Sequence, residues 1–304
     1  MTSLADGRFA PSPSGPLHLG NLRTALLAWL FARAGGGRFL VRVEDLDPDR
    51  SRREHELGQL ADLRALELDW DGPVVRQSER RARHLDALAT LREAGRVYPC
   101  WCTRAEIREA ASAAHGALPE GAYPGTCRRL SAAERAERER AGRPAALRLD
   151  ARGERIAFVD RLRGPQRALV DDAVLMRGDG TPAYNLAVVV DDADQGVREV
   201  VRGEDLLETT PRQLLIGRLL GLPAPAYAHV PLVLGSDGRR LAKRHGAVTL
   251  ADRAARGQTP ADVLAWMAAS LGLAAPDEPV DPALLLARFD PARLPRAPTT
   301  FAEA

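Results

Sequence analysis

The sequence predicts an α/β protein built around a parallel sheet, and three segments carry this prediction. Residues 8–30 read in order as a short strand, a turn rich in proline and glycine, and an apolar helix. Residues 38–43 are apolar enough for a buried parallel strand. Residues 197–201 predict a further strand, and a helix with Pro211 near its start follows it. Strands that alternate with helices are typical of an open α/β sheet.

Composition places the chain among globular proteins. A length of 304 residues can hold one large domain or two modest ones, and 45% hydrophobic with 28% charged residues is ordinary for such a protein. No apolar run approaches about 20 residues, and Met1–Gly7 has no signal-peptide core. We therefore expect a cytoplasmic monomer that binds no membrane. Three cysteines argue against a disulfide scaffold, and a net charge of +2 allows only local basic patches.

Lysine is nearly absent from the sequence. Lys and Arg together number 43, and Lys243 is the only lysine among them. Arginine carries a planar, forked guanidinium, whereas lysine carries a compact ammonium on a flexible stem. The single lysine therefore indicates a place where a guanidinium does not serve.

The first strand, turn and helix predict an anion-binding site. A strand that enters a helix through a Pro/Gly turn points the free N–H groups of the helix at a ligand beyond the strand end. His18 and Asn21 are three residues apart in the first turn, so both side chains can face a phosphate. Glu44 directly follows the strand at 38–43 and is a candidate partner for a substrate amino group, because open α/β sheets bind ligands at the carboxyl ends of their strands.

Two helices are expected at about 52–66 and 78–94, the second ended by Gly95. Cysteines follow them. Cys100 and Cys102 are two residues apart and can aim both sulfur atoms at one point, while Cys127 in a Gly/Pro turn can supply a third. A structural zinc ion takes four sulfur, nitrogen or oxygen ligands. The residues alone leave Tyr123, His115 or water as the fourth ligand, and three free buried cysteines as the alternative to a metal site.

The chain from residue 104 onward predicts an inserted domain, followed by the second half of the core sheet. Residues 104–148 are rich in Ala, Glu and Arg, as in a solvated helical insertion, and strands at 156–159 and 166–170 are assigned to the same insertion. A strand from 172 begins the second half of the core, and short helices follow residue 250. The expected domains are 1–97 (first half of the core), 98–171 (insertion), 172–250 (second half of the core) and 251–304 (helical C-terminal region).

Three separated segments resemble the signatures of class I aminoacyl-tRNA synthetases. Residues 10–21 (APSPSGPLHLGN) resemble the HIGH-type motif, with Asn21 where a second histidine is common, and the preceding RFAPSPSG is similar to the glutamyl/glutaminyl branch. Residues 172–205 resemble the half of glutamyl-tRNA synthetases that binds glutamate. Residues 240–244 (RLAKR) resemble the KMSKS loop, with Lys243 at the position of its catalytic lysine. The lone lysine and the motif are independent observations that agree.

The resemblance implies a class I, Rossmann-like parallel-sheet core with an inserted zinc-containing α+β domain and a short helical C-terminal extension. It implies that L-glutamate is activated by ATP with Mg²⁺, with His18 and Lys243 as catalytic residues. ATP contacts would come from His18, Gly20, Asn21 and Lys243. The C-x-C…Y-x-x-x-C pattern of the family implies one structural Zn²⁺ per chain, on Cys100, Cys102, Tyr123 and Cys127.

The same resemblance implies a glutamate site. Arg8, Tyr184 and Arg202 would hold the two carboxylates, since the arginine fork pairs with a carboxylate through two hydrogen bonds. The α-amino group would be held by Ser12 and Glu44, and Ala10 belongs to the same site. Val188 departs from an asparagine that full-length glutamyl enzymes commonly carry, which predicts weaker glutamate binding.

The acceptor is implied by resemblance as well. Only 54 residues follow Leu250, and the chain resembles the group of the glutamyl branch that lacks an anticodon-binding domain. That group activates glutamate without tRNA and esterifies it to the queuosine base in the anticodon of tRNA(Asp). The alternatives are a glutamyl-tRNA synthetase that relies on a separate anticodon-reading partner, an inactive tRNA-binding paralogue, and a nucleotidyltransferase of similar core that uses no RNA.

Overall fold

A computed structural model describes residues 5–103, 105–107, 122–242, 245–246 and 248–302. Its core is a seven-stranded sheet of order β3-β2-β1-β9-β10-β6-β7. Neighbouring strands from β3 to β6 pair in parallel, and only β6 and β7 pair antiparallel, so the expected parallel core is confirmed. The strands are β1 (Gly7–Phe9), β2 (Phe39–Val43), β3 (Val75–Arg76), β6 (Arg155–Asp160), β7 (Gly164–Leu169), β9 (Glu199–Gly203) and β10 (Ala226–Val230).

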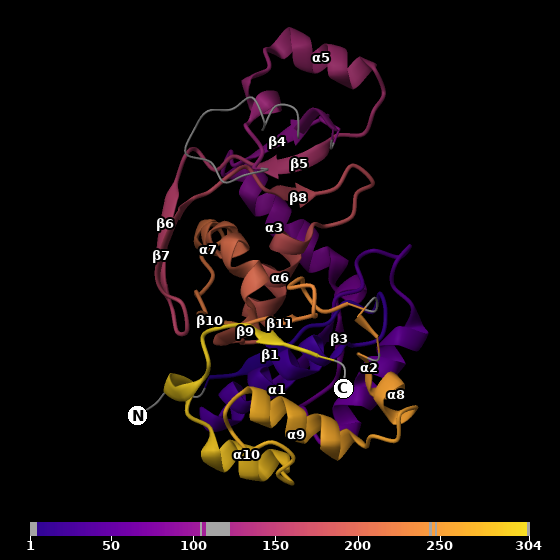
Figure 1. Cartoon of the computed structure of the whole chain (residues 1–304). Coiled ribbons are helices and arrows are strands. Elements are labelled where there is room, and N and C mark those ends of the chain that lie inside the picture. Colours follow the sequence, from indigo (N-terminus) through magenta and orange to yellow (C-terminus); the bar gives the residue numbers. More distant parts are fainter. Residues whose placement is uncertain (1–4, 104, 108–121, 243–244, 247, 303–304) are drawn as a thin grey trace.

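The first helix, α1 (Leu19–Ala34), lies between the core sheet and the C-terminal helices. The helical spacing of Leu22, Ala25, Leu26, Trp29 and Leu30 predicts one apolar face. The helix is buried on nearly every side, however, including Leu27 and Phe31 off that face. Figure 1 shows the reason: the core sheet covers one side of α1, and helices α9 (Pro260–Ser270) and α10 (Pro282–Arg288) cover the other.

The other helices surround the sheet. The two helices expected at about 52–66 and 78–94 are confirmed as α2 (Arg53–Ala65) and α3 (Arg81–Glu93), and Gly95 follows the second with a positive φ of 64°. The second half of the core contributes α6 (Tyr184–Asp194) and α7 (Thr210–Leu219). Pro211 lies in the first turn of α7, as expected, but Thr209 makes no side-chain capping hydrogen bond.

A smaller antiparallel sheet forms the inserted part. It has the order β4-β5-β8, from β4 (Val97–Cys100), β5 (Ala146–Leu149) and β8 (Val174–Met176). Helix α5 (Ala132–Arg140) forms the far tip of this part (Figure 1), and it has no buried residue, which confirms a solvated helix.

Strand pairing differs from the prediction at two places. The strand at 174–176, expected to begin the second half of the core, pairs with β5 in the smaller sheet. Strands β6 and β7, expected in the insertion, join the core sheet beyond β10, where Tyr227 pairs with Asp160. Phe158 of β6 packs edge-on against Tyr227 with ring centroids 6.0 Å apart, so apolar burial favours the core edge. The domain boundaries themselves stay a prediction.

The C-terminal region packs back onto the core. The expected short helices are confirmed as α8 (Leu250–Ala254), α9 and α10, and β12 (Thr299–Thr300) pairs in parallel with β11 (Val233–Leu234). The buried Arg23 of α1 ties these parts together. Its guanidinium donates to the hydroxyl and carbonyl of Ser270, to the Pro231 carbonyl and to the Thr299 hydroxyl.

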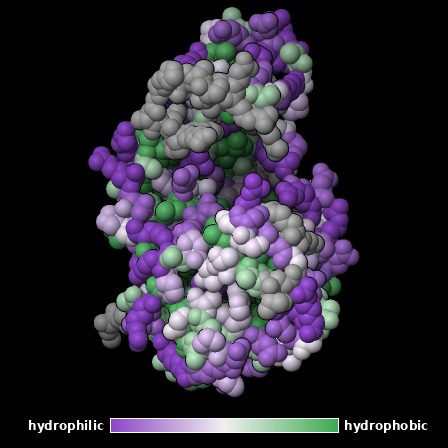
Figure 2. All heavy atoms as spheres, viewed as in Figure 1, coloured by the Kyte–Doolittle hydropathy of each residue, from purple (hydrophilic) through white to green (hydrophobic). Residues whose placement is uncertain are grey.

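The surface is mostly polar on the face drawn in Figure 2, where hydrophilic residues cover the tip that carries α5. Hydrophobic residues show in the hollow between this upper part and the core below it. Within the described part of the chain, no helix combines the length and apolar character that crossing a membrane would need.

Candidate active site

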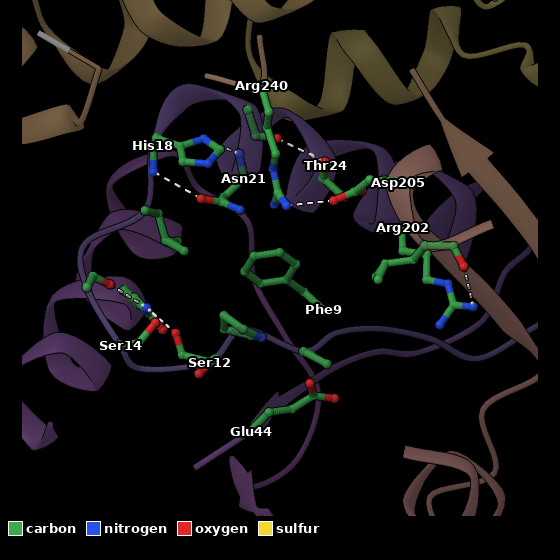
Figure 3. A pocket seen from close by; sticks show the side chains of 18 of the residues that line it. Phe9, Ser12, Ser14, His18, Asn21, Thr24, Glu44, Arg202, Asp205 and Arg240 are labelled. Atoms are coloured by element: carbon green, nitrogen blue, oxygen red, sulfur yellow. Dashed lines mark hydrogen bonds and ion pairs between the residues drawn. The ribbon is translucent and has the colours of Figure 1, made fainter. Parts of the chain in front are cut away.

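A cavity of about 610 Å³ opens beyond the carboxyl ends of β1, β2 and β9. Figure 3 shows His18, Asn21 and Arg240 along one side of it, Ser12 and Glu44 on the opposite side, and Arg202 at a third. The lining includes every glutamate- and ATP-site residue expected from the sequence that the structure describes: Arg8, Ala10, Ser12, His18, Gly20, Asn21, Glu44, Tyr184 and Arg202. The fold therefore brings side chains from positions as far apart as Arg8 and Arg202 to one cavity.

His18 caps the first helix and is held in one protonation state. Its Nδ1 accepts the backbone N–H of Asn21 at 3.2 Å, and the Asn21 Oδ1 accepts the backbone N–H of His18 at 3.2 Å. Because Nδ1 is an acceptor, the ring proton lies on Nε2. Burial, with help from Arg240, lowers the pKa of His18 to about 4. The ring is thus a neutral donor at pH 7, and Asn21 orients it.

Gly20 leaves room for this ring. A Cβ at Gly20 would lie 3.0 Å from both the Cε1 and the Nδ1 of His18, which is tighter than ordinary packing. The open backbone at Gly20 therefore lets His18 lie against the first turn of α1.

Residues 240–242, the described part of the segment that resembles the KMSKS loop, lie near His18. Lys243 itself falls outside the described residues. Three residues before Lys243, Arg240 lines the cavity and pairs with Asp205 at 2.6 Å. Five residues after Lys243, the carbonyl of Val248 accepts the backbone N–H of Leu19 at 2.7 Å. The chain on both sides of Lys243 is thereby placed beside the N-terminal end of α1.

Glu44 lies on the opposite side of the cavity, directly after β2. Its backbone N–H donates to the Pro11 carbonyl at 2.9 Å, which joins the end of β2 to the turn after β1. Its carboxylate lies 3.3 Å from the Arg42 guanidinium. Burial raises the pKa of Glu44, against the opposing effect of Arg42 and Arg8. A cationic amino group placed beside it would favour the ionised carboxylate.

Arg8 is fixed by a buried ion-pair cluster. Its Nε donates to Asp192 Oδ1 at 3.1 Å, and Arg42 donates to the same oxygen at 2.7 Å. Arg8 is 4% exposed and Arg42 is fully buried. The two guanidiniums therefore share Asp192 as their central anion, and Arg42 also pairs with Glu44. The arginines hold the pKa of Asp192 below its usual range although burial opposes them.

Arg202 and Tyr184 meet at the end of β9. Arg202 Nη1 lies 3.4 Å from the Tyr184 hydroxyl and donates to Gln213 Oε1 at 2.8 Å. Tyr184 is the first residue of α6, so its hydroxyl reaches the cavity from a helix start. Burial raises the pKa of Tyr184, and the nearby Glu44 adds to the shift. The phenol is therefore a neutral hydrogen-bonding group beside a guanidinium.

The three cysteines and Tyr123 converge elsewhere, at the end of β4. The sulfur atoms of Cys100, Cys102 and Cys127 all lie within 4.8 Å of one another. The Tyr123 Oη lies 3.4 Å from Cys100 Sγ and 3.6 Å from Cys102 Sγ, and it accepts the backbone N–H of Cys127 at 2.7 Å. The guanidinium of Arg148 lies 3.8 Å from the centroid of the Tyr123 ring, where it would stabilise negative charge on the phenol.

Sequence reasoning missed several site residues. Asp192 and His229 each contact an arginine of the cavity, and each lies in a mostly apolar run, VVVDD and AYAHV. A carboxylate or an imidazole in a buried segment needs a hydrogen-bond or ion-pair partner. The two runs could therefore have predicted that Asp192 and His229 have polar partners in the core. Arg240 and Asp205 lie in segments that resemble the family, but nothing in the sequence indicates that they pair with each other. Val188 is buried in α6 and lies outside the cavity lining formed by the described residues.

The fold and the cavity define a catalytic domain of the class I aminoacyl-tRNA synthetase type, with a Rossmann-like, mostly parallel sheet. The family model described as "tRNA synthetases class I (E and Q), catalytic domain" matches residues 6–274. The chain belongs to this family.

Relatives of known name indicate which group within this family the chain resembles. A protein named glutamyl-Q tRNA(Asp) synthetase from Nocardia farcinica is 66% identical, over 96% of this chain and 91% of the relative. Another protein of the same name, from Symbiobacterium thermophilum, is 55% identical over 96% of this chain and 94% of the relative. A crystal structure of a glutamate tRNA ligase from Elizabethkingia meningosepticum in complex with its amino acid matches with a TM-score of 0.83 at 28% identity, over 99% of this chain and 67% of that one. The chain thus groups with the glutamyl-Q tRNA(Asp) synthetases.

Proposed function

We propose that this protein activates L-glutamate with ATP, without needing tRNA, and transfers the glutamate to the queuosine base in the anticodon of tRNA(Asp). The observation that carries the proposal is the similarity to glutamyl-Q tRNA(Asp) synthetases along nearly the whole chain, up to 66% identity. The cavity beyond β1, β2 and β9 supports it, because the N-terminal end of α1 and the two arginines Arg8 and Arg202 line the same space.

In the first step, a carboxylate oxygen of glutamate attacks the α-phosphorus of ATP. A new O–P bond forms, the bond to the bridging oxygen breaks, and pyrophosphate leaves with glutamyl-adenylate remaining. The protein supplies no nucleophile; it aligns the reactants and stabilises the developing negative charge. We assign this role to the Nε2–H of His18, the helix end at Gly20 and Asn21, and Lys243. Mg²⁺ bound to ATP would add positive charge at the phosphates.

The amino acid would bind on the other side of the cavity. Arg8 and Arg202 would face its carboxylates with Tyr184, and Ser12 and Glu44 would hold its ammonium group. Ala10 contributes backbone and a small side chain to the same wall. The arrangement is supported by charge: the arginine side of the cavity suits anions, and Glu44 suits a cation.

In the second step, a hydroxyl of queuosine attacks the activated carbonyl carbon of the adenylate. An ester bond forms, AMP leaves, and the hydroxyl proton passes to a base or to water. Glutamate--tRNA ligases are also similar in sequence, one from Aquifex aeolicus being 42% identical over 89% of this chain and 58% of the relative. Transfer to the 3′ end of tRNA(Glu) is therefore the competing outcome.

We also propose that Cys100, Cys102, Tyr123 and Cys127 hold one structural Zn²⁺. Tetrahedral zinc with Zn–S bonds of about 2.3 Å would separate its sulfur ligands by roughly 3.8 Å. Cys102 and Cys127 lie 3.4 Å apart, Tyr123 provides an oxygen beside all three sulfur atoms, and so the donor set fits the ion. A bound zinc would fix the end of β4 without entering the reaction.

The test is to incubate the protein with ATP, labelled glutamate and either queuosine-containing tRNA(Asp) or tRNA(Glu), then digest the RNA and identify the labelled nucleoside. Label on queuosine supports the proposal, with tRNA(Asp) lacking queuosine as the control. Label on the 3′-terminal adenosine of tRNA(Glu) would overturn the acceptor. Absence of glutamate-dependent ATP–pyrophosphate exchange without tRNA would overturn the activation step and favour an inactive tRNA-binding paralogue.

A further inference from the structure

Arg202 is a buried cation that contacts only neutral groups. It is 5% exposed, and within the described chain no carboxylate forms an ion pair with it. Its guanidinium donates to the acceptors His229 Nε2 (3.1 Å), Gln213 Oε1 (2.8 Å), Thr210 Oγ1 (2.9 Å), Tyr184 Oη (3.4 Å), Leu206 O (3.4 Å) and Thr209 Oγ1 (3.5 Å). Arg8 differs, since Asp192 compensates its charge.

His229 can make its contact with Arg202 in only one neutral form. An arginine can only donate, so His229 Nε2 must accept, and the ring proton must lie on Nδ1. Nδ1 lies 2.6 Å from Asp160 Oδ2, which receives that proton as a hydrogen bond. Burial lowers the pKa of His229, in keeping with a neutral ring.

Asp160 is itself fixed in place. Its Oδ1 accepts the backbone N–H groups of Leu162 at 2.9 Å and Arg163 at 2.8 Å, and the backbone N–H of His229 also donates to its carboxylate. It is 1% exposed, and His229 is fully buried. The turn after β6 therefore fixes the position of the Asp160 carboxylate, and this carboxylate fixes the proton of His229 on Nδ1. The unprotonated Nε2 of His229 then fixes the orientation of the Arg202 guanidinium.

We propose that His229, oriented by Asp160, is the positioning residue that makes the amino-acid site select a carboxylate over an amide. This inference rests on the proposed binding of glutamate at Arg202. A carboxylate in direct contact would position Arg202 equally well but would neutralise it. The His229 imidazole instead accepts from Arg202 Nε and separates Arg202 from the negative charge of Asp160. The positive charge of Arg202 is therefore left uncompensated and can pair with a carboxylate of the ligand. A neutral amide such as glutamine would leave that buried charge uncompensated.

The experiment compares three variants in glutamate-dependent ATP–pyrophosphate exchange, with glutamate and glutamine binding measured by calorimetry. His229→Leu removes the acceptor and keeps the site apolar. We expect its KM for glutamate to rise about tenfold or more, the cost of losing a hydrogen bond to a buried charge. The kcat and the KM for ATP should stay within about threefold, because His18 and the helix end do not depend on His229.

The second variant, His229→Gln, places an amide oxygen where Nε2 lies and should recover most of the glutamate affinity. The third, Asp160→Asn, frees the ring to adopt the other tautomer, so its KM for glutamate should rise and its preference for glutamate over glutamine should fall. Asp160→Asn keeps the inference testable if His229→Leu does not fold. The matched control is His55→Gln on α2, which lies outside the cavity lining.

The outcomes separate the two proposals. Folded His229→Leu or Asp160→Asn with a wild-type KM for glutamate would overturn the positioning role, and so would equal losses in glutamate and ATP affinity. A wild-type protein that shows no glutamate-dependent exchange would instead overturn the proposed function. Unfolding temperatures of all variants, measured alongside, identify any that are merely unstable.

Discussion

The backbone N–H of Leu19 donates to the carbonyl of Val248 at 2.7 Å, which joins the first helix to the segment that follows Lys243. An isolated β-bridge between His18 and Thr249 continues the contact. The HIGH-type motif is therefore joined through the backbone to the segment that follows the KMSKS-like motif. A mutation in one should change the geometry of the other, and four predictions follow from this and neighbouring contacts.

Replacing Lys243 by arginine should lower the rate of ATP–pyrophosphate exchange by about 100-fold or more, although the charge is kept. A guanidinium is wide and planar, and it cannot follow a moving phosphate as a small ammonium can. The measurement is the kcat of exchange at saturating ATP and glutamate. The control is Arg167→Lys on the exposed face of β7; near-normal exchange in Lys243→Arg would contradict the argument from the lone lysine.

His18 should remain neutral across the physiological range in the free protein. Its Nδ1 accepts a backbone N–H and its ring is half-buried near Arg240, which lowers its pKa to about 4. Proton NMR should therefore show its Cε1–H signal shifting only as the pH falls toward 4, with His18→Gln used to assign the signal. A midpoint near 6.5 would mean that the cap is not formed in solution.

Asp192→Asn should destabilise the fold by about 3 kcal/mol, because two buried guanidiniums would lose their shared anion. The folded pKa of Asp192 is lowered from 3.8, so its contribution is complete above the unfolded value and is lost as the pH falls through the folded one. Urea unfolding at pH 7 and near pH 3 measures both effects, and the difference between variant and wild type should shrink at the lower pH.

The control for this comparison lies on the same helix. Asp194 pairs with Arg80 and Arg83 at a partly exposed position, so Asp194→Asn should cost less than about 1 kcal/mol. Equal losses in the two variants would show that the buried cluster around Arg8 gives no special stability.

The purified protein should contain about one equivalent of zinc by elemental analysis, since the three clustered cysteines together with Tyr123 would offer one four-ligand site. The double variant Cys100→Ser/Cys102→Ser should lose the metal. Tyr98→Phe is the control, because Tyr98 packs in the same small core but donates its hydroxyl to Asp172. Wild-type protein purified without chelator and free of metal would refute the site.

Local sequence patterns predicted the elements well but not their long-range partners. Strand and helix positions around the first turn follow from spacing and caps, and so does the placement of Glu44 beside the turn after β1. The pairs Arg8–Asp192 and Asp160–His229 are separated by 184 and 69 residues, and no periodicity links them. The pairing of β6 with β10 depends on aromatic packing that only the folded chain brings together. The residues of the cavity wall were therefore easier to predict than the residues that hold them.

The contacts of Arg23 determine how far the chain could be shortened. This one guanidinium bridges α1, the turn before β11 and the last strand, and every acceptor it uses is neutral. A chain cut after residue 250 would leave it without Ser270 and Thr299 and would open the outer side of α1 to water. The part of the chain that carries the cavity therefore could not be isolated as a minimal catalyst, because the C-terminal segment covers the other side of α1.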